Sequence, residues 1–285
     1  MRNHVVIWSI AAVTLLCAAA VVVLRQAFFS TVPREPAPEA LVSEAITRLA
    51  EDQAAWQPET QQAVRAAASV VEEGKVRTAE AYYVLAVQYK RERDLSDAEA
   101  LFKRAIALRP EWSWPYAGLG TLLGQHTYGR LGEAEQVLRK AIELAPEWGR
   151  PHNILAVVLR MQDRLEEAEK EARTALRLAP RDIAAHNNFA NLLVELERYG
   201  EAEEHYRKAI SLNPQHPKPY YNIACLYSIQ GQKTHALEYL EQALRKADVL
   251  RWDAAHDPDF EPLRDAPRFK ELVHGDRQPQ PNTGA

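Results

Sequence analysis

Apolar and small residues recur along the chain in a pattern that repeats mostly every 34 residues. Five segments, at 97–110, 133–146, 167–180, 201–214 and 235–248, each carry an alanine at the second position and another at the ninth. A proline closes the first four segments, and proline ends a helix because it lacks an N–H group and cannot continue the turn. The pattern therefore predicts five helices that belong to an internal repeat.

A second helical pattern precedes each of these segments. An aromatic residue or His is followed by apolar or small residues three, four and seven positions later, which together form one face of a helix. The small residues of this face are Ala86, Gly120, Ala156, Ala190 and Ala224. Antiparallel helices approach closely only where small side chains meet, so we expect crossings with Ala98, Ala134, Ala168, Ala202 and Ala236. One pair cannot bury its apolar face alone, and the pairs are predicted to stack into a superhelix.

This spacing closely resembles the tetratricopeptide-repeat (TPR) family, whose consensus is aromatic, Leu, Gly/Ala, Tyr, then Ala, Phe, Ala, Pro. The first repeat matches it at Tyr82, Leu85, Ala86, Tyr89, Ala98, Phe102, Ala105 and Pro110. The fourth repeat matches it at His186, Phe189, Ala190, Leu193, Ala202, Tyr206, Ala209 and Pro214. The resemblance covers residues 79–248 and implies an all-α solenoid of about five helix pairs.

The repeat phase divides the chain into segments. The repeats are expected at 79–112, 113–148, 149–182, 183–216 and 217–250, the second with two extra residues near 125–128. Residues 39–78 are helical in pattern but depart from the consensus, and we interpret them as a degenerate helical pair. Residues 251–274 resemble the closing segment of bacterial repeat arrays, with Phe260, Leu263, Phe269 and Leu272 expected to cover the last repeat. Residues 275–285 are expected to be a disordered tail.

The N-terminus carries an uninterrupted apolar run. Residues 5–24 contain no charge and only two polar side chains, and a helix of that length crosses the hydrocarbon core of a bilayer. We predict a transmembrane anchor at 1–29, followed by a Pro-rich linker at 30–38. The alternative is a cleavable signal peptide, because Ala18 to Ala20 offer a cleavage site. Basic residues on the two sides nearly balance, and we favour an inner-membrane protein with its repeats on the periplasmic side.

Charge and candidate chemistry narrow the class of protein. The 35 basic and 39 acidic side chains give a net charge of −4, without the basic footprint of a nucleic-acid-binding protein. The sequence lacks the common catalytic motifs, so we expect no enzyme activity, no cofactor, no metal and no small-molecule substrate. His152 and His186 lie 34 residues apart, which allows a metal or proton site. The competing interpretation is that both fill the packing slot of Tyr82, Tyr116 and Tyr220 in the other repeats. Trp112 and Trp148 are interpreted as joints between repeats.

The resemblance implies that the first helix of each pair lines a concave groove. The groove-facing residues predicted to bind a partner are Arg150, Asn153, Asn187, Asn188, Asn191, Lys218, Tyr221 and Asn222, with Val157 and Cys225 on the same face. Asn188 and Asn222 occupy the same slot, and an Asn side chain both donates to and accepts from the amide of an extended peptide. Of the family's clamp for carboxylate tails, these repeats match only Asn188 and Lys218, which argues against a chaperone-tail receptor.

These features predict a membrane-anchored scaffold that binds a protein or peptide partner in its groove, in a bacterial envelope assembly. The alternatives are a secreted soluble adaptor after signal cleavage and an enzyme with an untypical site. An enzyme would need a compact pocket, whereas a solenoid offers an open groove.

Overall fold

The structure, a computed structural model, describes residues 37–51, 57–126 and 130–274. The predicted anchor, nearly all of the predicted linker and the predicted tail lie outside these residues. Within the described part of the chain, no helix is both long and apolar enough to cross a membrane.

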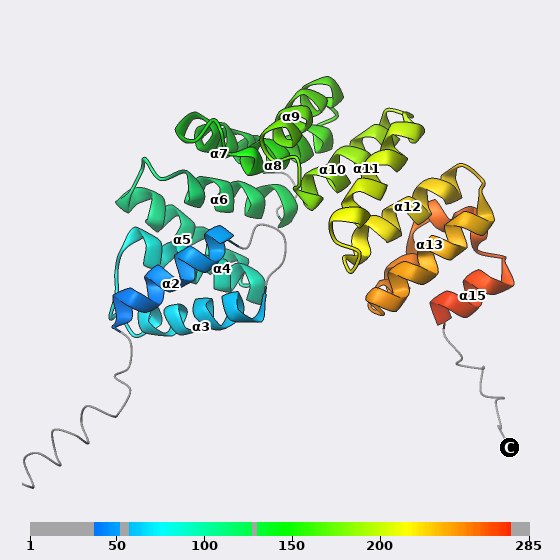
Figure 1. Cartoon of the computed structure of the whole chain (residues 1–285). Coiled ribbons are helices and arrows are strands. Elements are labelled where there is room, and N and C mark those ends of the chain that lie inside the picture. Colours follow the sequence, from blue (N-terminus) through cyan, green and yellow to red (C-terminus); the bar gives the residue numbers. More distant parts are fainter. Residues whose placement is uncertain (1–36, 52–56, 127–129, 275–285) are drawn as a thin grey trace, which may run out of the picture.

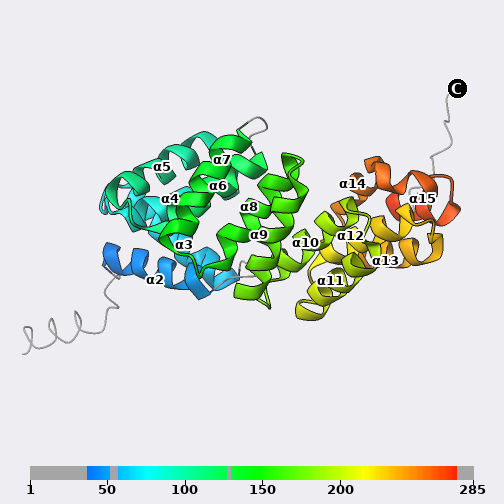
Figure 2. The same ribbon diagram turned by 90° about the horizontal axis from the view of Figure 1, so that it is seen from above.

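The described residues form helices only, arranged as successive antiparallel pairs (Figures 1 and 2). Before the repeats come α2 (Pro38–Glu51) and α3 (Pro58–Glu72). The five repeats are α4/α5 (Ala79–Glu92, Leu95–Leu108), α6/α7 (Ser113–His126, Leu131–Leu144), α8/α9 (Gly149–Met161, Leu165–Leu178), α10/α11 (Ile183–Glu195, Tyr199–Leu212) and α12/α13 (Pro217–Ile229, Lys233–Lys246). The chain closes with α14 (Leu250–His256), the 3-10 helix η1 (Pro258–Leu263) and α15 (Pro267–His274).

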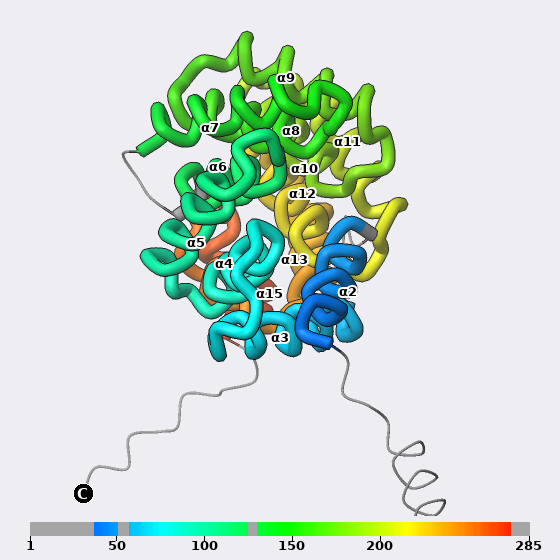
Figure 3. The backbone as a smooth tube through the Cα atoms, turned by 90° about the vertical axis from the view of Figure 1, so that its left-hand side faces the viewer, coloured from blue at the N-terminus to red at the C-terminus, as the bar shows by residue number. Residues whose placement is uncertain are grey.

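The array curves, and the two helices of each pair take different sides of the curve. Figure 3 shows α7, α9 and α11 along the outside and α8, α10 and α12 along the inside. The first helix of each central pair therefore forms the inner face, as the resemblance implies.

Small residues lie at the helix crossings because larger ones do not fit. The alanines predicted at the crossings are all buried, among them Ala86, Ala190 and Ala202 with no exposed surface. A Cβ atom added to Gly120 would lie 2.5 Å from the Cγ of Leu138, which is too close for two carbon atoms. The pattern of small residues thus fixes the distance between the two helices of a pair.

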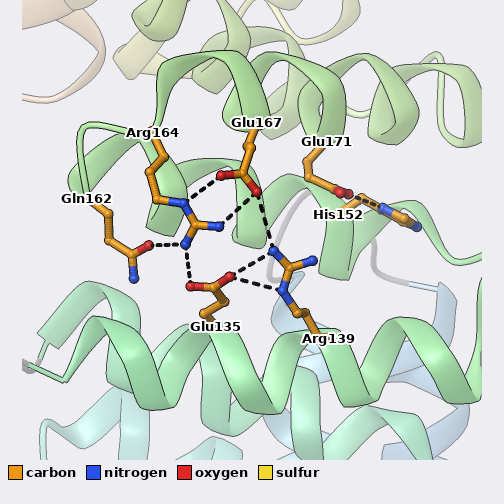
Figure 4. A network of polar contacts seen from close by, with 7 residues as sticks. All are labelled: Glu135, Arg139, His152, Gln162, Arg164, Glu167 and Glu171. Carbon is orange, nitrogen blue, oxygen red and sulfur yellow. Dashed lines mark hydrogen bonds and ion pairs between the residues drawn. The ribbon is translucent and has the colours of Figure 1, made fainter.

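A chain of ion pairs links the second helices of successive repeats. Arg164, just before α9, donates to Glu167 on α9 at 2.7 Å and to Glu135 on α7 at 2.7 Å (Figure 4). Arg130 and Arg198 stand 34 residues before and after Arg164 and bridge successive second helices in the same way. These arginines recur every 34 residues in the sequence. Their spacing therefore indicates the network, whereas the apolar pattern does not.

This network predicts a specific acid sensitivity. Hydrogen bonds from Arg130 and then Lys103 lower the pKa of Glu99 from its ordinary value of 4.5 to about 2. A lowered pKa stabilises the fold fully above pH 4.5, and this stabilisation is lost as the pH falls toward 2. We expect Glu99→Gln to flatten the loss of unfolding free energy across that window, as measured by denaturant titration. Glu166→Gln, on an exposed side chain of α9, is the matched control and should keep the wild-type pH profile.

The C-terminal residues cover the open end of the last repeat. Phe260 and Leu263 are fully buried, and Phe269 and Leu272 are nearly so. The 3-10 helix η1 packs against α12, and α15 packs against α13 and α14. The residues predicted to cover the fifth repeat therefore do so, through η1 and α15.

Candidate partner-binding groove

A ladder of asparagines runs along the inner face of the third to fifth repeats. Asn188 on α10 donates from Nδ2 to the Oδ1 of Asn153 on α8 at 3.1 Å. Asn222 on α12 donates from Nδ2 to the Oδ1 atoms of Asn187 and Asn191 on α10, both at 3.0 Å. The Asn191 oxygen also accepts from the Tyr206 hydroxyl at 2.7 Å. The structure thus brings the five predicted asparagines together and joins them by hydrogen bonds between repeats.

The asparagines of the ladder differ in how much they present to the groove. Asn153 is only 6% exposed and Asn187 only 8%, so these two lie between neighbouring helices and act as supports. Asn188 and Asn222 are half-buried, and both donate through Nδ2. Neither of their Oδ1 atoms accepts a hydrogen bond from another part of the described chain, so each remains available to a donor in the groove.

The other predicted groove residues have separate surroundings. Arg150 and Lys218 are exposed at the N-terminal ends of α8 and α12. Tyr221 is not free, because its hydroxyl donates to Asp257 at 2.8 Å and its ring meets Phe260 edge-on at 5.5 Å. Burial, together with this hydrogen bond, raises the pKa of Tyr221. The C-terminal segment therefore occupies Tyr221 at the fifth repeat.

The carboxylate of Asp257 takes the place that an asparagine holds in the ladder. It accepts a hydrogen bond from Tyr221 and lies 3.8 Å from the Cys225 sulfur. One repeat earlier, Asn187 and Asn191 occupy the positions of Tyr221 and Cys225, and Asn222 bonds to both. Asp257 also accepts from the backbone N–H of Asp259 at 3.0 Å and so caps η1. Sequence reasoning missed Asp257 because it follows the last repeat, where the 34-residue period no longer applies.

Cys225, Asp257 and Asp259 form the one group of potential metal ligands among the described residues, with their ligand atoms within 4.8 Å of one another. Burial raises the pKa of the Cys225 thiol well above its ordinary value, and burial also raises the pKa of Asp259. A cysteine binds a metal as its thiolate, whereas the Cys225 thiol donates to the Asp257 carboxylate. The contacts of this group therefore fit a joint between α12 and η1.

The two histidines considered for a metal or proton site occupy the tyrosine slot. Nε2 of His186 lies 3.1 Å from the carbonyl oxygen of Pro180. The Tyr116 and Tyr220 hydroxyls donate to the carbonyls six residues earlier in the same way. His152 contacts Glu171 at 2.6 Å, whereas His186 contacts His205 at 2.9 Å, so the two have different partners. Burial lowers the pKa of His186, which favours the neutral ring. These contacts favour the packing interpretation.

The fold and the groove define an α-solenoid of helix pairs with a polar inner face. A sequence model described as tetratricopeptide repeat matches residues 150–215 and 181–248, and a second model of the same description matches 79–111 and 126–147. Together the matches cover more than half of the chain, which belongs to the tetratricopeptide-repeat family. No curated protein shows significant sequence similarity to it.

Several solved structures share the fold. In the hetero-tetramer Cut9–Hcn1 of APC/C the TM-score is 0.63, with 17% identity over 86% of this chain and 44% of that one. TTC0263, a thermophilic TPR protein of Thermus thermophilus, gives 0.55 with 21% identity over 60% of this chain and 92% of that one. For pilF of Pseudomonas aeruginosa the TM-score is 0.53, with 20% identity over 74% of this chain and 92% of that one. These likenesses confirm the predicted helical-repeat fold.

Proposed function

We propose that this chain is a membrane-anchored, non-enzymatic scaffold whose inner groove holds an extended segment of a partner protein. One observation carries the proposal: the half-buried Asn188 and Asn222, on inner-face helices, are held by hydrogen bonds between repeats, and the carboxamide oxygen of each accepts no hydrogen bond within the described residues. Backbone N–H groups of an extended peptide are donors of the kind that such oxygens accept. Because the oxygens are preorganised, binding costs little side-chain ordering.

The proposal is tested by photocrosslinking from the groove. A benzoylphenylalanine at Ala184, which is exposed at the start of α10, should crosslink a partner in cells. The same probe at Arg177, exposed on α9 along the outside of the curve, is the control. Crosslinks are identified by mass spectrometry. Equal crosslinking from both positions, or crosslinking from Arg177 alone, would move the partner away from the groove.

Replacing Asn188 and Asn222 together by Ala is expected to weaken partner binding about tenfold, because each lost hydrogen bond contributes about 0.5–1.5 kcal/mol. The sequence alone placed both side chains outside the packing and predicted a stability change within about 0.5 kcal/mol. Their bonds within the ladder correct this, and we expect a loss of about 1–2 kcal/mol in unfolding free energy.

Asn153→Ala separates these two effects. It removes the acceptor that orders Asn188 but leaves both groove oxygens, so it should reduce stability and weaken binding clearly less than the double variant does. Affinities are measured with the partner identified by crosslinking. If the double variant binds as tightly as the wild type, the asparagine oxygens have no role in binding.

The anchor and the site of action belong to the same proposal. We place the chain in a bacterial inner membrane, with the repeats in the periplasm and a role in an envelope assembly, on the basis of the apolar run at residues 5–24. A secreted adaptor after signal cleavage is the alternative. We expect the protein to stay in the membrane pellet after alkaline carbonate washing. Quantitative release, or a mature chain that starts at Val21, would support the secreted adaptor.

A further inference from the structure

An aromatic pocket lies at the N-terminal end of the groove. Its volume is about 320 Å³, and it is a partly open hollow lined by residues of the C-terminal end of α2 and the first turns of α6 and α8. Its apolar walls are formed by Leu49, Tyr83, Trp114, Trp148 and Leu178. This size lies at the lower end of the range for ligand pockets, which suits one large side chain.

Trp114 is the centre of the aromatic wall. Its ring stacks on Trp148 with the centroids 6.1 Å apart and the planes at 30°, and on Trp112 at 5.9 Å and 28°. The centroid of the Tyr83 ring lies 5.8 Å away. Trp112 contacts Tyr83 of the first repeat and Trp114 of the second, so it forms the joint that the sequence suggested. Despite this stacking, Trp114 and Trp148 remain partly exposed and line the pocket.

The charges around the pocket argue against an ionic ligand. The exposed Glu147 and Arg150 lie at its edge with opposite signs. Asp182 also lines it, but one of its oxygens already accepts from the backbone N–H groups of Ala184 and Ala185 at the start of α10. An anion would be repelled by two carboxylates, and the attraction of a cation to them is offset by the Arg150 guanidinium, with Lys90 near it. A neutral ring has no such conflict and gains offset stacking with the tryptophans.

The pocket lies one helical turn of α8 away from the asparagine ladder. Arg150 lines the pocket, and Asn153, the first support of the ladder, follows three residues later on α8. Residues three apart lie on the same side of a helix. One bound segment can therefore place a side chain in the pocket while its backbone follows the ladder.

We propose that this pocket is the anchor subsite of the groove and takes an aromatic side chain of the partner polypeptide. This inference rests on the proposed function, because it assumes that the occupant belongs to a segment bound along the ladder. It adds a sequence preference to a groove whose asparagines alone read only the peptide backbone.

The pocket is tested directly with N-acetyl-5-fluorotryptophanamide and the full-length chain in lipid nanodiscs, followed by fluorine NMR with empty nanodiscs as background. We expect saturable binding that Trp114→Ala weakens about tenfold through lost stacking and apolar contact. Ala50→Trp, which fills the pocket from an exposed position on α2, should abolish binding without removing a ring of the wall. Trp252→Ala, at a 69% exposed tryptophan of α14, is the matched control and should bind like the wild type.

Competition with other amino-acid amides tests which class of side chain the pocket binds. N-acetylphenylalaninamide should displace the probe, whereas N-acetylargininamide and N-acetylaspartic acid amide should not. Displacement by either charged amide, or unchanged binding by both pocket variants, would overturn the proposal.

A random-peptide display selection on the same nanodiscs separates the two proposals. Enriched peptides should share one aromatic position, and this preference should disappear on the Ala50→Trp variant. Peptides enriched without an aromatic preference would overturn the anchor subsite and leave the groove function standing. Probe binding without any enriched peptide, together with no crosslinks from the groove, would overturn the proposed function and the polypeptide occupant with it.

Discussion

Replacement of Ala190 by Trp is expected to lower the free energy of unfolding by about 1–3 kcal/mol or more. Ala190 is fully buried on α10 and belongs to the crossing with α11, where Ala202 is also fully buried. An indole ring at this position forces the two helices apart, and both rest on neighbouring pairs. The measurement is denaturant unfolding followed by circular dichroism.

Ala184→Trp is the matched control, because it adds the same ring to an exposed position of the same helix. It should leave the unfolding midpoint close to that of the wild type. Equal midpoints for Ala190→Trp and the wild type would show that this crossing is looser than the structure indicates.

Phe260→Ala is expected to cost about 3–5 kcal/mol, because it removes a large, fully buried ring. The ring centroid lies 5.5 Å from that of Tyr221 and 5.7 Å from that of Phe269, so loss of the ring loosens both η1 and α15. In a repeat array each unit contacts only its neighbours, and the effect should stay near the C-terminus. Hydrogen exchange should therefore accelerate in residues 250–274 and in α12, but not in α4 to α8.

Trp252→Ala, on the exposed face of α14, is the comparison and should change exchange little. Uniformly faster exchange along the whole array after Phe260→Ala would contradict this expectation. It would mean that the array unfolds as one cooperative unit.

The repeated helix pairs could be predicted from the sequence because the determinants are local and periodic. Alanines such as Ala190 and Ala202 recur at fixed positions, and a buried crossing has room for nothing larger. The same period placed Asn188 and Asn222 on one face. Which amide bonds to which does not follow from the sequence, because the Asn188–Asn153 contact depends on how adjacent repeats rotate against each other.

Two parts of the site depend on long-range geometry. The pocket requires the end of α2 to come opposite the start of α8, which follows from the curvature of the whole array. The cover on Tyr221 comes from Asp257, in a segment outside the repeat. Trp114 was overlooked because no other repeat carries Trp at the corresponding position, so the period gave no reason to select it.

The contact of Asp257 with α12 also determines where further repeats can be added to this array. A solenoid normally lengthens by adding a unit to an open edge, but here that edge is already occupied by Asp257 and Phe260. A further unit appended after residue 274 could not stack on α12, because η1 already packs there. An extra 34-residue unit inserted ahead of α12 would keep both ends intact and would lengthen the groove by one helix pair. The reach of the groove along a partner is therefore set by the number of internal units.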